Sequence, residues 1–274
     1  CIFKGVVGDS QRRKRNGDCA MKVEVLGCSG AEFPGFNLPG FLIDGKILLD
    51  AGTIGASLSE NAQWKIRHIV VSHAHLDHIR GIPFLADNII IKNKRHNVTV
   101  IGIAQVLKSL KNNLLNNKIW PDFTMIPNAE KAVIRFLEVK PGKQIEVNGY
   151  KITAYRVNHS VPATGYIIDR RGKRLLYTGD TGTTHAIWKE AGRVKIDRAI
   201  IEVSFPNKME AMAVETGHLT PKLLKKELGK IKIPPDKILI THPKPQYLKT
   251  IRSEIKKLGI PNIRILKDGE VINI

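Results

Sequence analysis

The sequence predicts an α/β protein in which two β-sheets stack face to face and helices cover the outside. Three observations support this fold class. Predicted strands come in consecutive pairs, predicted helices separate these groups, and the order of elements in the first half of the chain recurs in the second. Neither an internal repeat nor a low-complexity linker divides residues 21–274, so we expect them to form one domain.

The first half of the chain is expected to contribute four strands and one helix. The strands are predicted over residues 22–26, 41–44, 46–50 and 67–72. A turn at Gly45 joins the second strand to the third, and the fourth is an apolar run that leads directly into a group of histidines. Residues 103–115 are predicted to form a helix because their apolar residues recur on one face.

The second half repeats this order of elements. Its strands are predicted over residues 151–157, 166–169, 174–178, 198–203 and 237–241. A helix is expected to begin at Thr220, because threonine is a favoured N-cap and Pro221 suits the first helical position. A last helix is predicted over residues 248–258, and it ends at Gly259.

The composition is that of a soluble globular protein. Of the 274 residues, 42% are hydrophobic and 25% are charged. No apolar run approaches the roughly 18 residues of a membrane span, and residues 1–7 are too short and interrupted for a signal-peptide core. Three cysteines do not make a disulfide framework and suit a reducing compartment. We therefore expect a cytoplasmic protein that does not bind membranes.

Residues 1–20 differ from the rest of the chain. They contain the basic run at residues 12–15 and no periodic pattern, whereas a clean strand pattern opens at Met21. We expect residues 1–20 to be a disordered or non-native N-terminal extension, with a functional basic tail as the alternative.

The formal net charge is +19, and the basic run accounts for little of it. A field of this sign attracts anions and raises their local concentration. The charge therefore indicates an anionic partner, but it does not distinguish a nucleotide from a nucleic acid.

Residues 73–78 read His-Ala-His-Leu-Asp-His and follow directly on a predicted strand. Imidazole and carboxylate ligands together suit zinc, and also manganese or iron. Four such ligands within six residues do not easily converge on one ion, but they can serve two adjacent ions. We therefore predict that His73, His75, Asp77 and His78 begin a dinuclear metal site.

Three further candidates lie at the ends of predicted strands: His159, Asp180 and His242. Each alone is weak evidence, because a single histidine is more often structural. Their recurrence at strand ends in one chain strengthens the prediction. The carboxylate of Asp180 is well placed to bridge two metals, because each of its oxygens can bind one ion.

In these motifs and their order, residues 21–274 resemble the metallo-β-lactamase superfamily. The resemblance includes the Gly27–Gly30 turn, the Asp50-Ala51-Gly52 sequence and the histidine-rich motif. It implies a four-layer αββα sandwich with the metals at one edge. It further implies one metal bound by His73, His75 and His159, a second bound by Asp77, His78 and His242, and Asp180 as the bridging ligand.

A second pair of motifs resembles the phosphodiesterase branch of the superfamily, which includes the RNase Z enzymes. These motifs are Glu-Val-Ser-Phe from Glu202 and Gly-His-Leu-Thr around His218. By this resemblance Glu202 orients His218, which donates a proton to the leaving oxygen after attack by a metal-bound hydroxide. The expected catalytic residues are His218, Glu202 and Asp77. A surface histidine at a helix start is the alternative for His218.

Two phosphodiester substrates remain open. Residues 75–82 resemble the signature of class II 3′,5′-cyclic-nucleotide phosphodiesterases, although residues 83–87 depart from its usual continuation. The sequence also lacks the inserted Gly-rich arm with which RNase Z grips tRNA. The positive charge, including Lys92, Lys94, Arg95 and His96, instead favours RNA. We expect hydrolysis of cyclic AMP or cyclic GMP to 5′-monophosphates, with RNase Z-like RNA processing as the alternative.

The expected cofactors are two divalent ions, zinc in the first place and manganese or iron as alternatives. The expected partner is a small anionic nucleotide substrate, or RNA in the alternative function. Homodimers are common in the family, and the sequence does not decide whether this chain forms one. A non-catalytic nucleic-acid-binding homologue is the second alternative, and the complete ligand set argues against it.

Overall fold

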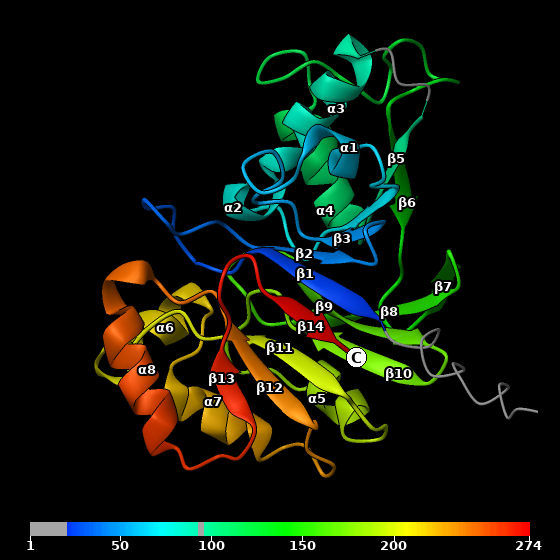
Figure 1. The fold of residues 1–274 in the computed structure, drawn as a ribbon. Coiled ribbons are helices and arrows are strands. Elements are labelled where there is room, and N and C mark those ends of the chain that lie inside the picture. Colours follow the sequence, from blue (N-terminus) through cyan, green and yellow to red (C-terminus); the bar gives the residue numbers. More distant parts are fainter. Residues whose placement is uncertain (1–20, 93–95) are drawn as a thin grey trace, which may run out of the picture.

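The computed structural model describes residues 21–92 and 96–274, and these residues form two seven-stranded β-sheets (Figure 1). The first sheet has the order β14-β1-β2-β3-β4-β5-β6. Its strands are β1 Lys22–Gly27, β2 Gly40–Ile43, β3 Ile47–Leu49, β4 His68–Val70, β5 Val98–Gly102, β6 Ile134–Glu138 and β14 Val271–Asn273. The second sheet has the order β13-β12-β11-β10-β9-β8-β7. Its strands are β7 Gln144–Val147, β8 Tyr150–Val157, β9 Ala163–Arg170, β10 Lys173–Tyr177, β11 Arg198–Glu202, β12 Lys237–Thr241 and β13 Ile263–Ile265.

Helices cover the outer face of each sheet, so the described chain forms four layers (Figure 1). On the first sheet lie α1 Glu60–Gln63, α2 Leu76–Ile79, α3 Gly81–Ile91 and α4 Ala104–Ser109. On the second sheet lie α5 Ala186–Ala191, α6 Glu210–Thr216, α7 Pro221–Leu228 and α8 Leu248–Lys257. Within the described ranges, no helix combines the length and the apolar character that crossing a bilayer requires.

Two apolar clusters account for this layering. The larger cluster fills the space between the sheets, where Phe41 of β2 meets Tyr177 of β10 at a centroid distance of 5.3 Å. It also includes apolar side chains of α3 and α4 on the first sheet. The smaller cluster packs α5 to α8 against the outer face of the second sheet, with the fully buried Trp188 of α5 among its members. Strands of the second sheet contribute side chains to both clusters, because successive residues in a strand point to opposite faces.

The order of the strands brings several of their ends to one edge of the molecule. Strands β3 to β6 are parallel to one another, as are β10 to β13. Strand β8 runs in the same direction as β10, because both are antiparallel to β9. Polar residues that follow β4, β8, β10 and β12 can therefore meet at this edge.

Polar contacts join the two sheets close to that edge. The Tyr177 hydroxyl donates a hydrogen bond of 2.5 Å to Oδ2 of Asp50, which follows β3. The Tyr166 hydroxyl of β9 donates one of 2.7 Å to the Val71 carbonyl, which follows β4. All four residues are buried, so these bonds fix the ends of the two sheets relative to each other.

The αββα sandwich expected from the sequence is confirmed, as are the nine strands predicted from patterns, within one to three residues at their ends. Two expectations need correction. The helix predicted over residues 103–115 ends in a π-helical turn at Leu110–Leu114, and α3 was not predicted at all. Residues 1–20 and 93–95, with the basic residues Lys94 and Arg95, lie outside the described residues.

The buried Glu227 of α7 gives a test of the packing on the second sheet. Its carboxylate accepts hydrogen bonds from Trp188 Nε1 at 2.6 Å, the Thr184 backbone N–H at 3.0 Å and Lys230 Nζ at 2.6 Å. Because Glu227→Ala leaves these donors without their acceptor, we expect it to lower the free energy of unfolding by about 3 kcal/mol. Urea denaturation measures this loss. An equal loss of unfolding free energy in the exposed control Glu215→Ala would contradict this stabilising role of Glu227.

Candidate metal centre

The histidine-rich motif lies where β4 leads into α2. His73 comes shortly after β4, His75 is the N-cap of α2, and Asp77 and His78 lie in the first turn of that helix. The helical turn places the Asp77 and His78 side chains next to each other, with Asp77 Oδ2 3.8 Å from His78 Nε2. The motif therefore presents two pairs of side chains in different directions.

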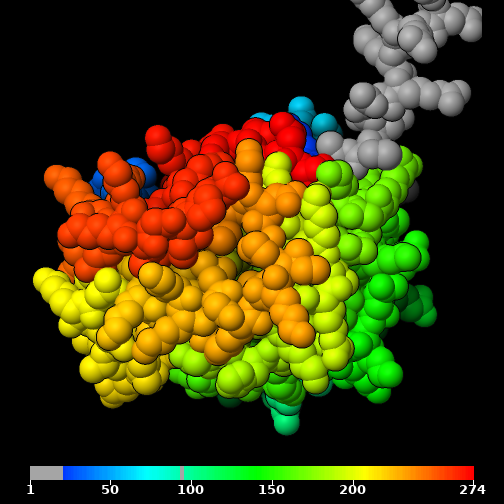
Figure 2. All heavy atoms as spheres, turned by 90° about the horizontal axis from the view of Figure 1, so that it is seen from below, coloured from blue at the N-terminus to red at the C-terminus, as the bar shows by residue number. Residues whose placement is uncertain are grey.

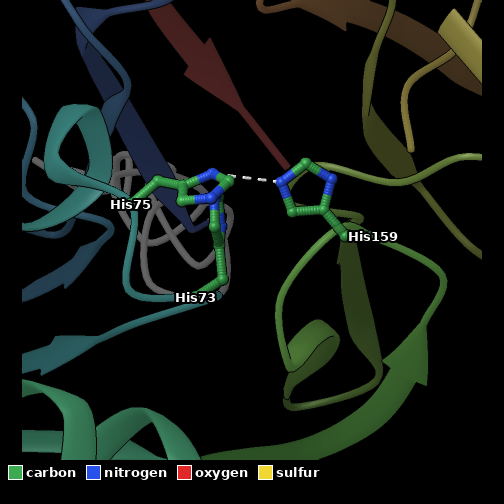
Figure 3. Close-up of side chains that lie close together, drawn as sticks. All are labelled: His73, His75 and His159. Carbon is green, nitrogen blue, oxygen red and sulfur yellow. Dashed lines mark hydrogen bonds between the residues drawn. The ribbon is translucent and has the colours of Figure 1, made fainter. Parts of the chain in front are cut away.

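His73 and His75 meet His159, which follows β8 in the second half of the chain (Figure 3). The three rings lie edge to face, with centroid distances of 4.6 to 4.9 Å. His159 Nδ1 donates a hydrogen bond to the Gly217 carbonyl at 2.8 Å. This leaves the lone pair of His159 Nε2 facing His75 Nδ1 at 3.1 Å. The three histidines form the first group of potential metal ligands.

Asp77 and His78 meet two residues that follow strands of the second sheet, Asp180 after β10 and His242 after β12. His242 Nε2 lies 3.3 Å from Asp77 Oδ2 and 3.3 Å from Asp180 Oδ2. Asp180 Oδ2 is also 3.3 Å from His78 Nε2 and 3.8 Å from Nε2 of His73 in the first group. Asp180 therefore lies between the two groups.

The charges in this cluster depend on burial and on the two central carboxylates. Burial lowers the pKa of His73, and the neighbouring His78 adds to that effect. Burial also disfavours a charged His78, but Asp180 and Asp50 outweigh it and raise the pKa of His78 well above its usual value. Burial disfavours ionised Asp180 as well, yet His242 and His78 hold the Asp180 pKa well below its usual value. The cluster thus attracts positive charge to its centre.

The donor atoms of the cluster fit divalent metal ions. His73 Nε2 and His78 Nε2 are buried and have no hydrogen-bond partner among the described residues, a costly state for a polar atom unless a ligand satisfies it. Within each of the two groups the potential ligand atoms lie within 4.8 Å of one another. Neutral imidazoles and carboxylates are the ligands of zinc, manganese and iron sites. The cluster therefore has the chemistry of a two-metal centre.

Groups behind the histidines hold each ring in one orientation. His78 Nδ1 donates to Asp50 Oδ2 at 2.7 Å, and Ser72 Oγ accepts from His73 Nδ1 at 3.0 Å. Ser204 Oγ likewise accepts from His242 Nδ1 at 2.8 Å. Each bond leaves Nε2 of the ring directed into the cluster, which is how supporting residues commonly orient metal-binding histidines.

His218 and Glu202 lie together at the border of the cluster. His218 Nδ1 donates to Glu202 Oε1 at 2.8 Å, and the His218 ring stacks on the His242 ring at a centroid distance of 5.5 Å. Burial disfavours a charged His218, but Glu202 outweighs burial and raises the pKa of His218 above its usual value. The fully buried Glu202 is held in turn by the backbone N–H groups of Thr181 and Leu219.

The backbone position directly before His218 requires a glycine, which is Gly217. Its φ of 71° is left-handed, and it ends helix α6 at the C-cap. A Cβ at this position would lie 2.8 Å from the Cα of His159. Glycine therefore lets the helix end, while its carbonyl remains close enough to hold the His159 ring.

All the candidate residues predicted from the sequence thus lie in one cluster: His73, His75, Asp77, His78, His159, Asp180, Glu202, His218 and His242. Asp77 lies in the second group of potential ligands. The sequence did not reveal the supporting roles of Asp50, Ser72 and Ser204. For Asp50, the available signals were its place at the end of an apolar strand and in the Asp50-Ala51-Gly52 sequence of the family resemblance.

The chain matches the family described as "Beta-lactamase superfamily domain" over residues 46–242. It is similar to a probable 3′,5′-cyclic-nucleotide phosphodiesterase of Yersinia pestis, with 28% identity over 182 residues that cover 61% of this chain and 51% of the relative. It is also similar to ribonuclease Z of Pyrococcus horikoshii, with 26% identity over 219 residues that cover 73% and 68%, respectively. The chain thus spans about half the length of the Yersinia relative.

Among solved structures, unliganded yeast PDE1 shares the fold with a TM-score of 0.79. The two chains are 17% identical, and the match covers 93% of this chain and 100% of the yeast chain. Identity this low shows a common fold and leaves the reaction to be argued from the residues of the site.

The arrangement predicts two bound divalent ions per chain. We expect elemental analysis to find two ions per chain after incubation with zinc or manganese and removal of the excess. Asp180→Ala should reduce the count by at least one, because Asp180 lies between both groups of ligands. His185→Ala, an exposed histidine at the start of α5, should keep both ions. Equal metal content in the two variants would contradict the proposed ligand set.

Asp50 is expected to control metal affinity without touching the metals. Because Asp50→Ala removes the acceptor that orients His78, we expect it to weaken binding of the more weakly held ion by about 10- to 100-fold. Titration against a chelator measures this change, with Asp87→Ala on α3 as the control. If Asp50→Ala does not fold, Ser72→Ala should still weaken binding through His73. Unchanged metal affinity in Ser72→Ala would then contradict the prediction that residues behind the histidines control metal binding.

Proposed function

This chain belongs to the β-lactamase superfamily, and on that premise we propose that it is a metal-dependent phosphodiesterase that converts 3′,5′-cyclic nucleotides to 5′-monophosphates. The observation that carries the phosphodiesterase reaction is the hydrogen-bonded His218–Glu202 pair beside the two groups of potential ligands. The similarity to a probable cyclic-nucleotide phosphodiesterase favours cyclic nucleotides as the substrate.

The His218–Glu202 pair suits the departure of an alkoxide. When the bond between phosphorus and the 3′ oxygen breaks, that oxygen leaves with a negative charge and needs a proton. His218 keeps its proton readily, because Glu202 raises its pKa. With Nδ1 bound to Glu202, the Nε2–H of His218 is the group that donates to the 3′ oxygen. Glu202 thus orients the ring and stabilises its charge.

Two divalent ions, when bound, would activate a water molecule for attack and stabilise the charge on the phosphate. We assign one ion to His73, His75 and His159, and the other to Asp77, His78 and His242, with Asp180 between them. We propose zinc first, with manganese and iron as alternatives, because imidazole and carboxylate ligands suit all three. Asp77 contributes to the reaction as a ligand of the second ion.

RNA is the second candidate substrate. The net charge of +19 favours a polyanion, and the similarity to ribonuclease Z of Pyrococcus horikoshii points the same way. The His218–Glu202 pair would protonate a ribose oxygen in either reaction, so the site residues do not separate the two substrates. The homodimer and the cytoplasmic location remain predictions from the sequence.

Parallel assays distinguish the two substrates. The full chain, loaded with zinc or manganese, is incubated with cyclic AMP, cyclic GMP and a 3′-extended precursor tRNA. We expect release of 5′-AMP or 5′-GMP from the cyclic substrates. Cleavage of the tRNA with both cyclic nucleotides untouched would assign the protein to RNA processing instead. No turnover of any of the three, with two metals bound, would reject both substrates.

His218→Ala tests the proton donor in the same assay. We expect kcat to fall by a factor of about 10²–10⁴, while the bound metal remains at two ions per chain because His218 is not a proposed ligand. The control is His185→Ala, which should retain full activity. If the His218→Ala protein keeps its turnover rate, another group supplies the proton.

A further inference from the structure

A basic groove lies between α8 and β13, on the edge of the second sheet. It has a volume of about 780 Å³, and Arg252, Lys256, Arg264 and Lys267 line it together with isoleucine side chains. Helix α8 and strand β13 pack against each other, and Figure 2 shows this part of the chain, in orange-red, exposed on one face of the molecule. The α8–β13 groove shares no residue with the metal centre.

One wall of the groove is a sheet edge with free peptide groups. Strand β13 pairs with β12, and within the described ranges no other strand pairs with it. Its bonds to β12 include the Asn262 carbonyl and the Leu266 N–H. Because successive peptide groups in a strand point in opposite directions, those of Ile263 and Ile265 point away from β12. They form a short row of donors and acceptors along the groove.

The charge of the groove is strongly positive. Arg264 is paired with Glu270 at 2.8 Å, and Glu270 is the one acid among the lining residues. Arg252, Lys256 and Lys267 form no salt bridge with any acid in the described part of the chain. Three uncompensated cations therefore stand beside an open strand edge.

We propose that the α8–β13 groove binds an acidic peptide segment of a partner protein, which adds to β13 as an extended strand. The peptide groups of Ile263 and Ile265 would pair with the backbone of the segment. Acidic side chains on the face of the segment that looks toward α8 would meet Arg252 and Lys256, beside the isoleucine side chains of the groove. The inference is independent of the reaction at the metal centre.

Charge and side-chain type favour this occupant over two others. A second copy of this chain would bring the same cations to the interface, and like charges at such short range repel. Single-stranded nucleic acid usually binds on aromatic side chains that stack with its bases, and the residues that line the groove include none. An acidic extended peptide satisfies both the cations and the strand edge.

Fluorescence anisotropy on the full chain tests the proposal. The probe is a labelled peptide of alternating acidic and valine residues, Asp-Val-Glu-Val-Asp-Val-Glu. We expect saturable binding, and we expect Arg252→Glu combined with Lys256→Glu to weaken it about tenfold or more. The matched control is Lys249→Glu combined with Lys257→Glu, which makes the same change of net charge on α8 but outside the groove. It should leave the affinity within about twofold.

Two further probes test strand addition and the chemical class of the partner. Prolines in place of the central valine and of the glutamate before it remove one backbone donor on each side of the segment and should abolish most of the binding. Equal losses in the two double variants, unchanged binding of the proline peptide, or no binding at about 1 mM peptide would each overturn the proposal. Binding of oligouridylate that is lost in the Arg252 and Lys256 double variant, without peptide binding, would assign the groove to nucleic acid and reject the peptide.

Discussion

The buried carboxylate of Asp50 is the interaction on which the rest of the structure depends. It accepts hydrogen bonds from the Ser72 backbone N–H, the Ser72 hydroxyl, the Tyr177 hydroxyl and His78 Nδ1. These donors belong to the end of β4, to β10 of the other sheet and to the metal-binding motif. A buried carboxylate is tolerated only when its charge is well satisfied. Satisfying Asp50 therefore requires the two sheets and the histidine motif to be in register.

Similar hydrogen bonds connect the other residues of the site. Ser72 connects Asp50 to His73, and Ser204 connects His242 to the Glu202 carboxylate that holds His218. Each ring thus has its outer nitrogen bound by the protein, while its inner nitrogen faces the centre of the cluster. The apolar core on both sides excludes water from these bonds, which strengthens their electrostatic component. These bonds hold the rings from the protein side of the site.

The sequence predicted the layers and the placement of the candidate residues because both follow from local patterns. Strands with buried faces are recognised by their apolar runs, and His159, Asp180 and His242 stand directly beyond such runs. Helix α3 was not predicted for two reasons. Phe84 and Ile91 are apolar residues on its exposed side, so the pattern of one apolar face is lost. Pro83 also resembles a helix breaker, although proline is tolerated in the first turn of a helix. The supporting bonds of Asp50 and Ser204 join residues far apart in the chain, and no local pattern records such contacts.

The division of the ligand groups between the two halves of the chain has a consequence for biosynthesis. The motif at residues 73–78 is synthesised first, whereas Asp180 and His242 follow much later in the chain. A nascent chain can offer the first residues to a metal, but neither group is complete until the second sheet has formed and docked. The second group of ligands is therefore complete only once β12 has been synthesised and paired, and a chain truncated before β12 would have an incomplete centre.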